Sequence, residues 1–229
     1  SADVAAAIPA VPADYGFNNA MINVAALHDQ GETGEGAVVA VIDSGVANST
    51  AVAAISGSVI GGETLVPTSG AGADPIVSPT SRYNGPHGTW VGTTSAGHRL
   101  FLFGNSSPVV QALRTYAPDS VIPCPGIYGC NSAYSVVPVI GSAPDAKLYA
   151  LKVFPSTSDS APTSRITAAM DRVLTLRRNY NLGVASTPVS GGGTEDNPYK
   201  YDSLKIDVVN LSLGGPTLIA GDDVQDLLT

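Results

Sequence analysis

The feature that most constrains the fold is an uninterrupted apolar segment, Ala37–Ile42, that runs directly into Asp43. Its length suits a strand, and the lack of polar alternation is typical of a strand covered on both faces. Two further strand-like segments follow at Ala146–Phe154 and Ile206–Leu211. Strands that alternate with helices predict an α/β fold of three layers, with a mainly parallel sheet and helices on both of its faces.

Helical segments are predicted between these strands. Residues 19–30 favour a short helix that Gly31 ends, and residues 87–97, which follow Pro86, favour a helix of small residues. A third helix is expected to begin at Ser164, which would cap it. The apolar side chains of this helix recur at helical spacing on one face: Ile166, Met170, Val173 and Leu174.

The remaining segments are rich in turn-forming residues. Residues 61–86 are predicted to form a loop, and residues 99–140 and 181–205 are predicted to be two long insertions. A last helix is expected to begin at Asp222 or Asp223. The whole chain is interpreted as part of a single domain whose sheet is incomplete.

The charge balance excludes several classes of function. The chain of 229 residues carries a formal net charge of −8 and only 11 Lys and Arg residues. So few cations cannot neutralise the phosphates of a nucleic acid, and they give little attraction to an anionic membrane surface. No stretch approaches the roughly 18 apolar residues needed to cross a bilayer. We therefore expect neither nucleic acid nor a membrane as a partner.

Two cysteines, Cys124 and Cys130, flank a short segment that contains two glycines. This spacing allows a small disulfide loop, and the alternative is a pair of free thiols in a loop. We expect the disulfide because the other ligands of a metal site are missing nearby. Disulfides persist in oxidising compartments, so the pair predicts a secreted, extracellular protein. No signal-like segment follows Ser1, which predicts a processed N-terminus.

Asp43 is the first residue in which we expect chemistry. A carboxylate at the end of an apolar strand is costly unless it is hydrogen-bonded or paired. Ser44 and Gly45 allow a tight turn that leaves the carboxylate oxygens accessible to a partner. In open parallel sheets, ligands bind beyond the carboxyl ends of the strands. The alternative is an aspartate that only caps a turn.

His87 is the second such residue. It opens a predicted helix, where partial positive charge favours the neutral imidazole that a general base needs. A carboxylate bonded to one ring nitrogen would fix the tautomer of the ring. Gly88 is expected to remove bulk beside the ring, so that a substrate can approach. The alternative is a surface histidine at a helix start. His28 and His98 lie near predicted helix ends and are assigned no catalytic role.

Four segments occur in the order found in one known family: AALHDQGETGEGAVVAVIDSGV, HGTWVGTTSAG, GSAPDAKLYALKVF and DVVNLSLGG. With them, residues 1–229 resemble the N-terminal part of a subtilisin-like catalytic domain, the domain of the subtilisin-like serine proteases. The resemblance implies that Asp43 and His87 are the aspartate and histidine of an Asp-His-Ser triad, which occur in that order along the chain. It also implies the subtilisin-like variant of the three-layer α/β fold.

The last of these segments implies a substrate-binding role for Ser212, Leu213 and Gly214. In the family this stretch binds the main chain of a peptide substrate. Gly214 and Gly215 present backbone without side chains, so an extended peptide could add alongside as a strand. The alternative is a plain turn between a strand and a helix. Elsewhere, Trp90–Gly92 departs from the His-Val-Ala of the family, which we expect to affect packing only.

The family's nucleophile is missing from this sequence. It stands in a Gly-Thr-Ser motif after an oxyanion-hole asparagine, and the sequence up to Thr229 contains no such motif. One explanation is a complementary C-terminal polypeptide that carries both residues and stays associated after proteolytic processing. A second is a partial sequence. A third, from a different class of function, is a catalytically inactive, protease-like binding or structural protein.

The favoured interpretation is a two-chain serine endopeptidase that acts on peptide or protein substrates. Retention of both Asp43 and His87 in intact motifs favours it over the inactive protein. Its chemistry would require no cofactor, because acyl transfer to a serine needs only the triad and an oxyanion hole. The resemblance allows a structural calcium ion, but no loop shows a readable pattern of calcium ligands, so the metal ligands are unassigned.

Overall fold

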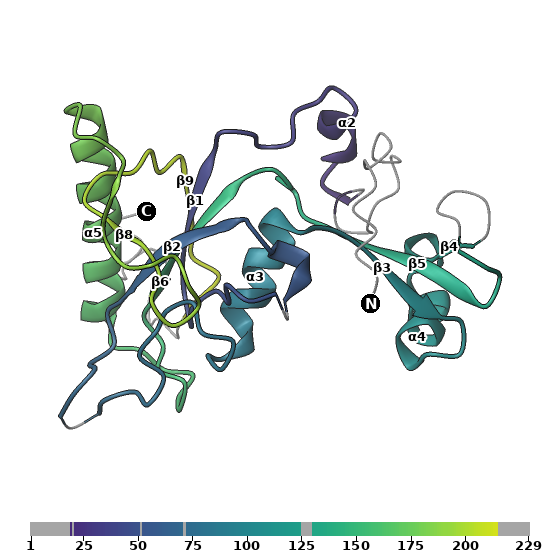
Figure 1. The fold of residues 1–229 in the computed structure, drawn as a ribbon, viewed down its shortest axis with the longest axis horizontal. Helices are drawn as coiled ribbons and strands as arrows, with labels where there is room; N and C mark the ends of the chain where they lie inside the picture. Colours follow the sequence, from purple (N-terminus) through teal and green to yellow (C-terminus); the bar gives the residue numbers. More distant parts are fainter. Residues whose placement is uncertain (1–18, 20, 51, 71, 125–129, 215–229) are drawn as a thin grey trace, which may run out of the picture. The chain divides into compact units, whose positions relative to one another are not determined.

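The computed structural model describes residues 19, 21–50, 52–70, 72–124 and 130–214 (Figure 1). They divide into two compact units. The first contains the described residues of Ser1–Glu35 and Thr93–Asp145, and the second contains those of Gly36–Gly92 and Ala146–Thr229. The last helix that the sequence predicts, at Asp222 or Asp223, lies outside the described residues.

A four-stranded sheet forms the centre of the second unit. Its strands are β1 (Val38–Asp43), β2 (Val59–Thr64), β6 (Lys147–Lys152) and β9 (Val208–Asn210), in the order β2-β6-β1-β9. Every neighbouring pair is parallel (Figure 1). The three strands expected from the sequence are therefore present, and the prediction of an α/β fold with a parallel sheet is confirmed. The register pairs Asp43 with Lys152 at the carboxyl edge of the sheet.

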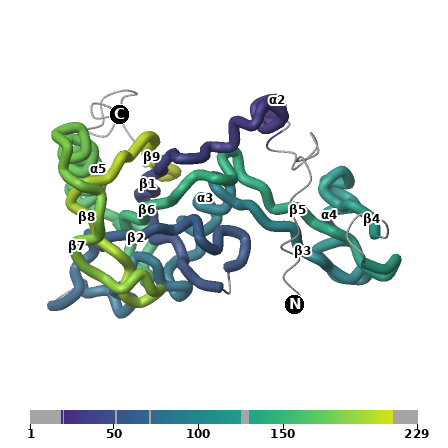
Figure 2. Tube along the Cα trace, turned by 45° about the horizontal axis from the view of Figure 1, so that its top comes forward, coloured from purple at the N-terminus to yellow at the C-terminus, as the bar shows by residue number. Residues whose placement is uncertain are grey.

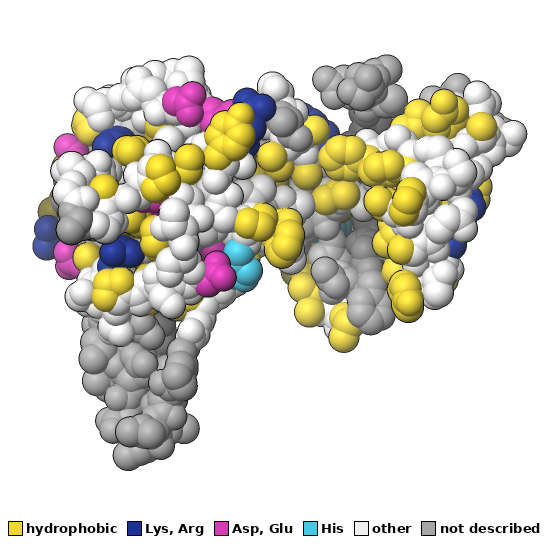
Figure 3. All heavy atoms as spheres, turned by 90° about the horizontal axis from the view of Figure 1, so that it is seen from below, with side chains coloured by type: hydrophobic (Ala, Val, Ile, Leu, Met, Phe, Trp, Pro, Cys, Tyr) yellow, Lys and Arg dark blue, Asp and Glu magenta, His cyan; other side chains and the backbone are white. Residues whose placement is uncertain are grey.

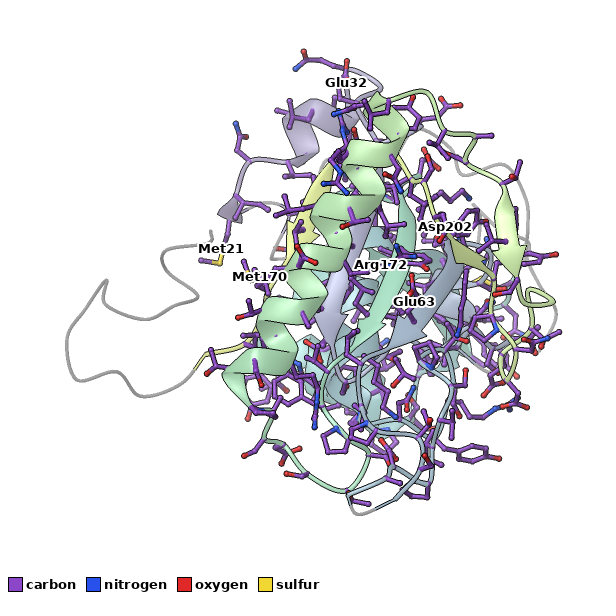
Figure 4. The ribbon with its side chains drawn as sticks, turned by 90° about the vertical axis from the view of Figure 1, so that its left-hand side faces the viewer. Met21, Glu32, Glu63, Met170, Arg172 and Asp202 are labelled. Atoms are coloured by element: carbon purple, nitrogen blue, oxygen red, sulfur yellow. A yellow bond between two sulfur atoms is a disulfide. The ribbon has the colours of Figure 1, made fainter. Side chains whose placement is uncertain are left out.

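One face of this sheet is covered by α5 (Thr163–Asn181), which lies in front of the strands in Figure 4. Alternate residues of β1 and β6 point to this helix, as the two-residue period of a strand requires. The core between them consists mainly of Ala40, Ile42, Tyr149 and Leu151 from the strands and of Ile166, Ala169, Met170, Val173 and Leu176 from the helix. Tyr149 and Tyr201 stack edge to face, with ring centroids 5.9 Å apart.

Two details of the α5 prediction are wrong. Pro162 occupies the N-cap position without a side-chain cap, and Ser164 lies inside the first turn. Leu174 is 65% exposed, whereas Leu176 is fully buried. The buried side chains of α5 recur at spacings of three or four residues, and after Val173 the next of them is Leu176. Leu174 therefore lies at the margin of the buried face.

The opposite face of the sheet is covered by the start of α3 (Pro86–Ala96), so helices flank the sheet. The contact is close: a Cβ atom added to Gly92 would lie 2.9 Å from Cγ1 of Val46 and 3.2 Å from Cδ1 of Leu148. The predicted helix of small residues is therefore confirmed. Small side chains allow its backbone to approach the sheet.

The segments predicted as a loop and an insertion in this unit contain strands. The loop expected from residue 61 begins instead after β2, whose glycines conceal it in the sequence. A side chain at Gly61 would overlap the carbonyl oxygen of Tyr199. The insertion 181–205 contains a two-stranded antiparallel ribbon of β7 (Pro188–Ser190) and β8 (Lys200–Tyr201). A short 3-10 helix at Ala53–Ile55 precedes β2.

The first unit has an antiparallel sheet of its own, formed within the predicted insertion 99–140. Its strands are β3 (His98–Gly104), β4 (Ile122–Pro123) and β5 (Tyr134–Ile140), in the order β3-β5-β4. β3 and β5 run side by side in Figure 2. The unit also contains α4 (Pro108–Tyr116), the 3-10 helix Pro118–Ser120 and α2 (Ala25–His28).

The helix predicted over residues 19–30 is interrupted. Asn19 and Met21 are helical, the chain then turns, and α2 begins at Ala25, because Asn23 has a positive φ of 57° that a continuous α-helix does not allow. Gly31 ends the turn that follows, and its N–H donates to the carbonyl oxygen of His28 over 2.9 Å. In the same unit, Cys124 and Cys130 are joined by a disulfide.

Candidate active site

Asp43 and His87 are in direct contact. The Nδ1 atom of His87 lies 2.9 Å from Oδ2 and 3.0 Å from Oδ1 of Asp43. An ionised carboxylate can only accept hydrogen bonds, so Nδ1 carries the proton and Nε2 of the neutral ring is free to accept one. The carboxylate side chain is 1% exposed and the imidazole 56% exposed. A buried acceptor thus holds a ring that solvent and reactants can reach.

The fold explains why these two residues meet. Asp43 is the last residue of the central strand β1, and His87 is the second residue of α3 on the face of the sheet opposite α5. The backbone N–H of Ser44 donates to Oδ1 of Asp43 over 2.6 Å. This bond and the imidazole satisfy a carboxylate that would otherwise be costly to bury.

The hydroxyl of Ser44 fastens the strand end to the helix start. It donates to the carbonyl oxygen of Gly85 over 2.8 Å and accepts from the N–H of Gly88 over 3.0 Å. A second bond between the two segments runs from the N–H of Ala47 to Oγ1 of Thr89, over 3.1 Å. From the sequence, Ser44 is predicted only to allow the tight turn after Asp43. In the sequence, only its position between Asp43 and Gly45 indicates a role for Ser44 in connecting the strand end to the helix start.

Gly88 serves a purpose different from the one expected. A Cβ atom at this position would overlap the carbonyl oxygen of Gly45 and lie 3.0 Å from both Cβ and Oδ1 of Asp43. The missing side chain therefore lets the helix approach the strand end. The expectation that it opens a path for a substrate is not what this contact shows.

Replacing Gly88 by alanine is expected to lower the free energy of unfolding by about 1–3 kcal/mol, because the added methyl group must push backbone atoms apart. Chemical denaturation of the purified protein measures this change. The matched control is Gly104→Ala, since a Cβ atom added there meets nothing within 4 Å. Equal stabilities for the two variants would contradict the close approach of α3 to β1.

The predicted substrate-binding residues lie at the same edge of the sheet. The last pair between β1 and β9 joins Val41 with Asn210, so the chain leaves the sheet two residues before the level of Asp43. Ser212 is exposed, and its N–H and hydroxyl both donate to Oδ1 of Asn210, over 3.1 and 2.9 Å. Leu213 packs partly against the core and Gly214 is exposed. Gly215 lies outside the described residues.

The other two histidines have structural partners in the first unit. Nε2 of His28 lies 3.0 Å from the carbonyl oxygen of Ser142. Nδ1 of His98 lies 3.0 Å from the carbonyl oxygen of Ala96. These contacts agree with the interpretation that neither residue is catalytic.

A buried ionic network that the sequence did not reveal lies next to Asp43 in the sheet. Nζ of Lys152 is 2.8 Å from Oδ2 of Asp74, and the side chains are 0% and 3% exposed. Burial raises the pKa of Asp74, but hydrogen bonds from Lys152, Ser156 and the N–H of Ile76 outweigh it and hold the pKa at about 2. Burial lowers the pKa of Lys152, and the bond to Asp74 opposes that shift.

This network predicts a loss of stability in acid. The pKa of Asp74 falls from 3.8 to about 2 on folding, so the unfolded chain binds a proton first as the pH falls. The free energy of unfolding should therefore drop by about 2 kcal/mol from this residue as the pH falls from about 5 to 2. Denaturation at several pH values measures it. In the double variant Asp74→Asn, Lys152→Met this part of the pH dependence should vanish, and an unchanged slope would contradict the assignment.

No group of three or more His, Cys, Asp or Glu side chains that could hold a metal ion occurs among the described residues. The structural calcium ion therefore stays a prediction. Within the same residues, no helix combines the length and the apolar character that crossing a membrane requires.

No protein-family model matches the chain, and no curated protein matches it. The structure itself defines the class of protein: an α/β protein in which a buried aspartate is bonded to an exposed histidine at the carboxyl edge of a parallel sheet. The likeness to the subtilisin-like serine proteases rests on the four sequence segments alone.

Proposed function

We propose that this chain is the N-terminal part of the catalytic domain of a subtilisin-like serine endopeptidase. The observation that carries the proposal is the bond from His87 Nδ1 to the buried carboxylate of Asp43. It supports a general base with a fixed tautomer and an accessible second nitrogen, which is the arrangement that a serine nucleophile requires.

The reaction would proceed by acyl transfer. Nε2 of His87 takes the proton of a serine hydroxyl while the serine oxygen attacks the carbonyl carbon of the scissile peptide bond. Asp43 orients the ring and stabilises the imidazolium that forms. The imidazolium then gives its proton to the leaving amine as the C–N bond breaks, which leaves an acyl-enzyme. A water molecule, deprotonated by His87, hydrolyses the acyl-enzyme and restores the serine.

The segment after β9 supports the binding of an extended peptide. Leu211–Gly214 leaves the sheet at the edge that carries Asp43, and a Cβ atom added to Gly214 would meet nothing within 4 Å. Open backbone of this kind accepts another strand through main-chain hydrogen bonds. The peptide or protein substrate would therefore lie along Ser212, Leu213 and Gly214, with its scissile bond near His87.

The nucleophile and the oxyanion-hole asparagine would come from a complementary C-terminal polypeptide. Among the described strands, β9 pairs with β1 alone, and its Val208 is 52% exposed. A largely apolar cavity of about 330 Å³ lies beside it, lined by Thr167, Met170, Asp171, Val173, Leu174, Val209 and Leu211. Figure 3 draws one face of the molecule and shows hydrophobic side chains scattered among polar ones. An open edge beside apolar surface is suited to further chain that extends the sheet.

The environment expected for such an enzyme agrees with the disulfide between Cys124 and Cys130. Disulfides of this kind persist outside the reducing cytosol, which supports secretion. Neither nucleic acid nor a membrane is part of the proposal, because the formal net charge is −8 and cations are few.

The test uses the protein as purified from its source. Its polypeptides are treated with a fluorophosphonate, which phosphonylates an activated serine, and are then weighed by denaturing mass spectrometry. The expected result is a label on a serine outside residues 1–229, on a polypeptide that copurifies with this chain or continues it. A protein that contains this chain alone and takes no label would overturn the proposal and favour an inactive, protease-like binding or structural protein.

A further inference from the structure

Lys152 is a fully buried cation whose ammonium group has three oxygen acceptors. They are Oδ2 of Asp74 at 2.8 Å, Oδ1 of Asn84 at 2.6 Å and the carbonyl oxygen of Ile76 at 2.5 Å. Three acceptors match the three protons of an ammonium group. All of them come from the loop that joins β2 to α3, so a residue of the sheet holds the loop that leads to His87.

Asn84 is the acceptor that connects Lys152 to the candidate active site. It stands three residues before His87, and its side-chain amide donates to the carbonyl oxygen of Ser78 over 2.9 Å. That amide nitrogen also lies against the turn after Asp43, because a Cβ atom added to Gly45 would be only 2.5 Å from it. Asn84 is thus packed between the buried ammonium group and the turn that follows the carboxylate.

The ammonium group itself is held in a fixed position. Asp74 accepts from the N–H of Ile76 over 2.8 Å, and from the N–H and hydroxyl of Ser156 over 2.7 and 2.5 Å. Ser156 follows shortly after β6, and Lys152 is the last residue of that strand. Both ends of the ion pair are therefore tied to the same end of β6, next to Asp43 in the sheet.

Stability alone does not account for a lysine at this position. Replacing a buried ion pair by apolar residues of similar volume is often neutral or stabilising, whereas a buried cation demands satisfied hydrogen bonds. The ion pair instead fixes the positions of the groups that it joins, because charge-assisted hydrogen bonds are short and geometrically strict.

We propose that Lys152 is a positioning residue for the Asp43–His87 pair. Through Asn84 it presses the segment that leads into α3 against the turn after Asp43, and so sets the distance from His87 Nδ1 to the carboxylate. Its effect on hydrolysis rests on the proposed protease function. Its effect on the imidazole–carboxylate bond does not, because that bond lies within this chain.

The test compares Lys152→Met with Arg172→Met. Arg172 supplies the matched control, because it is also an ion-paired cation of this unit. It lies 3.0 Å from Glu63, is 22% exposed, and stands on the α5 side of the sheet (Figure 4). Both variants are expected to lower the melting temperature. Only Lys152→Met should weaken the His87 Nδ1–H signal, read by NMR in protein labelled with ¹⁵N-histidine. It should also lower kcat by about tenfold to a hundredfold with KM little changed, since small misplacements of catalytic groups have effects of this size.

A second variant keeps the proposal testable if Lys152→Met does not fold. Lys152→Met with Asp74→Asn removes both charges and keeps an oxygen acceptor at position 74, and it should show the same loss of the Nδ1–H signal. The inference is overturned if the double variant folds and keeps both the wild-type signal and kcat. Failure of the protease proposal can be distinguished from failure of this inference. In that case no serine would be labelled in the wild-type protein, but the NMR signal of His87 could still be compared between the variants.

Discussion

Replacing His87 by alanine is expected to lower kcat for peptide hydrolysis by a factor on the order of 10⁶, the largest effect of any single change in this chain. Without the imidazole, no group takes the proton of the serine hydroxyl or returns it to the leaving amine. The rate that remains would come from substrate binding and the oxyanion hole. Hydrolysis of a chromogenic peptide by the enzyme with its nucleophile-bearing polypeptide measures the loss, and fluorophosphonate labelling should slow in parallel.

His98→Ala is the matched control for this variant. In His98, as in His87, Nδ1 lies close to an oxygen acceptor, here the carbonyl oxygen of Ala96 at 3.0 Å, and His98 has no role in the proposed site. Its replacement should leave kcat within a few-fold of wild type. If His87→Ala labelled and hydrolysed as fast as His98→Ala, His87 would not be the general base.

Replacing Asp43 by asparagine is expected to lower kcat by a factor on the order of 10⁴. An asparagine of the same shape fits the site, but its NH₂ group can donate to Nδ1 and so place the ring proton on Nε2. That tautomer cannot accept the serine proton. The result would be a folded protein with an impaired base, visible as a large fall in kcat at neutral pH with the substrate KM little changed.

The control for Asp43→Asn is Asp207→Asn, which changes a carboxylate bonded to the opposite end of β1. Asp207 accepts from the N–H of Val38, the first residue of β1, over 3.1 Å and pairs with Arg177 over 3.2 Å. Asp207→Asn removes a carboxylate from the same sheet without touching His87, so kcat should stay near the wild-type value. Similar losses in the two variants would show that sheet stability, and not the tautomer of His87, is responsible.

The elements that carry the candidate site could be predicted from the sequence because their signals are local. The apolar run of β1 ends at Asp43, and a proline followed by small residues marks the start of α3 at His87. Direct contact between the two residues does not follow from either pattern. It was expected from a resemblance in motif order, and the structure places the two side chains within hydrogen-bonding distance.

What the sequence did not reveal depends on contacts between distant residues. Strand β2 was missed because Gly61 has a low strand propensity, although only glycine fits against Tyr199. The network of Asp74, Asn84 and Lys152 was missed because each residue looks ordinary among its neighbours in sequence. Their relation exists only when the loop folds back onto the end of β6.

The burial of Asp43 also determines how the candidate site responds to dissolved salt. Ions in solution screen charges that they can surround, such as the exposed pair of Arg82 and Glu195, whose side chains are 45% and 14% accessible. They cannot surround a carboxylate that is 1% accessible. The imidazole of His87 is 56% exposed, so ions can approach the pair only from the side of the ring. Added salt should therefore weaken the attraction between Asp43 and an imidazolium less than it weakens the pair of Arg82 and Glu195.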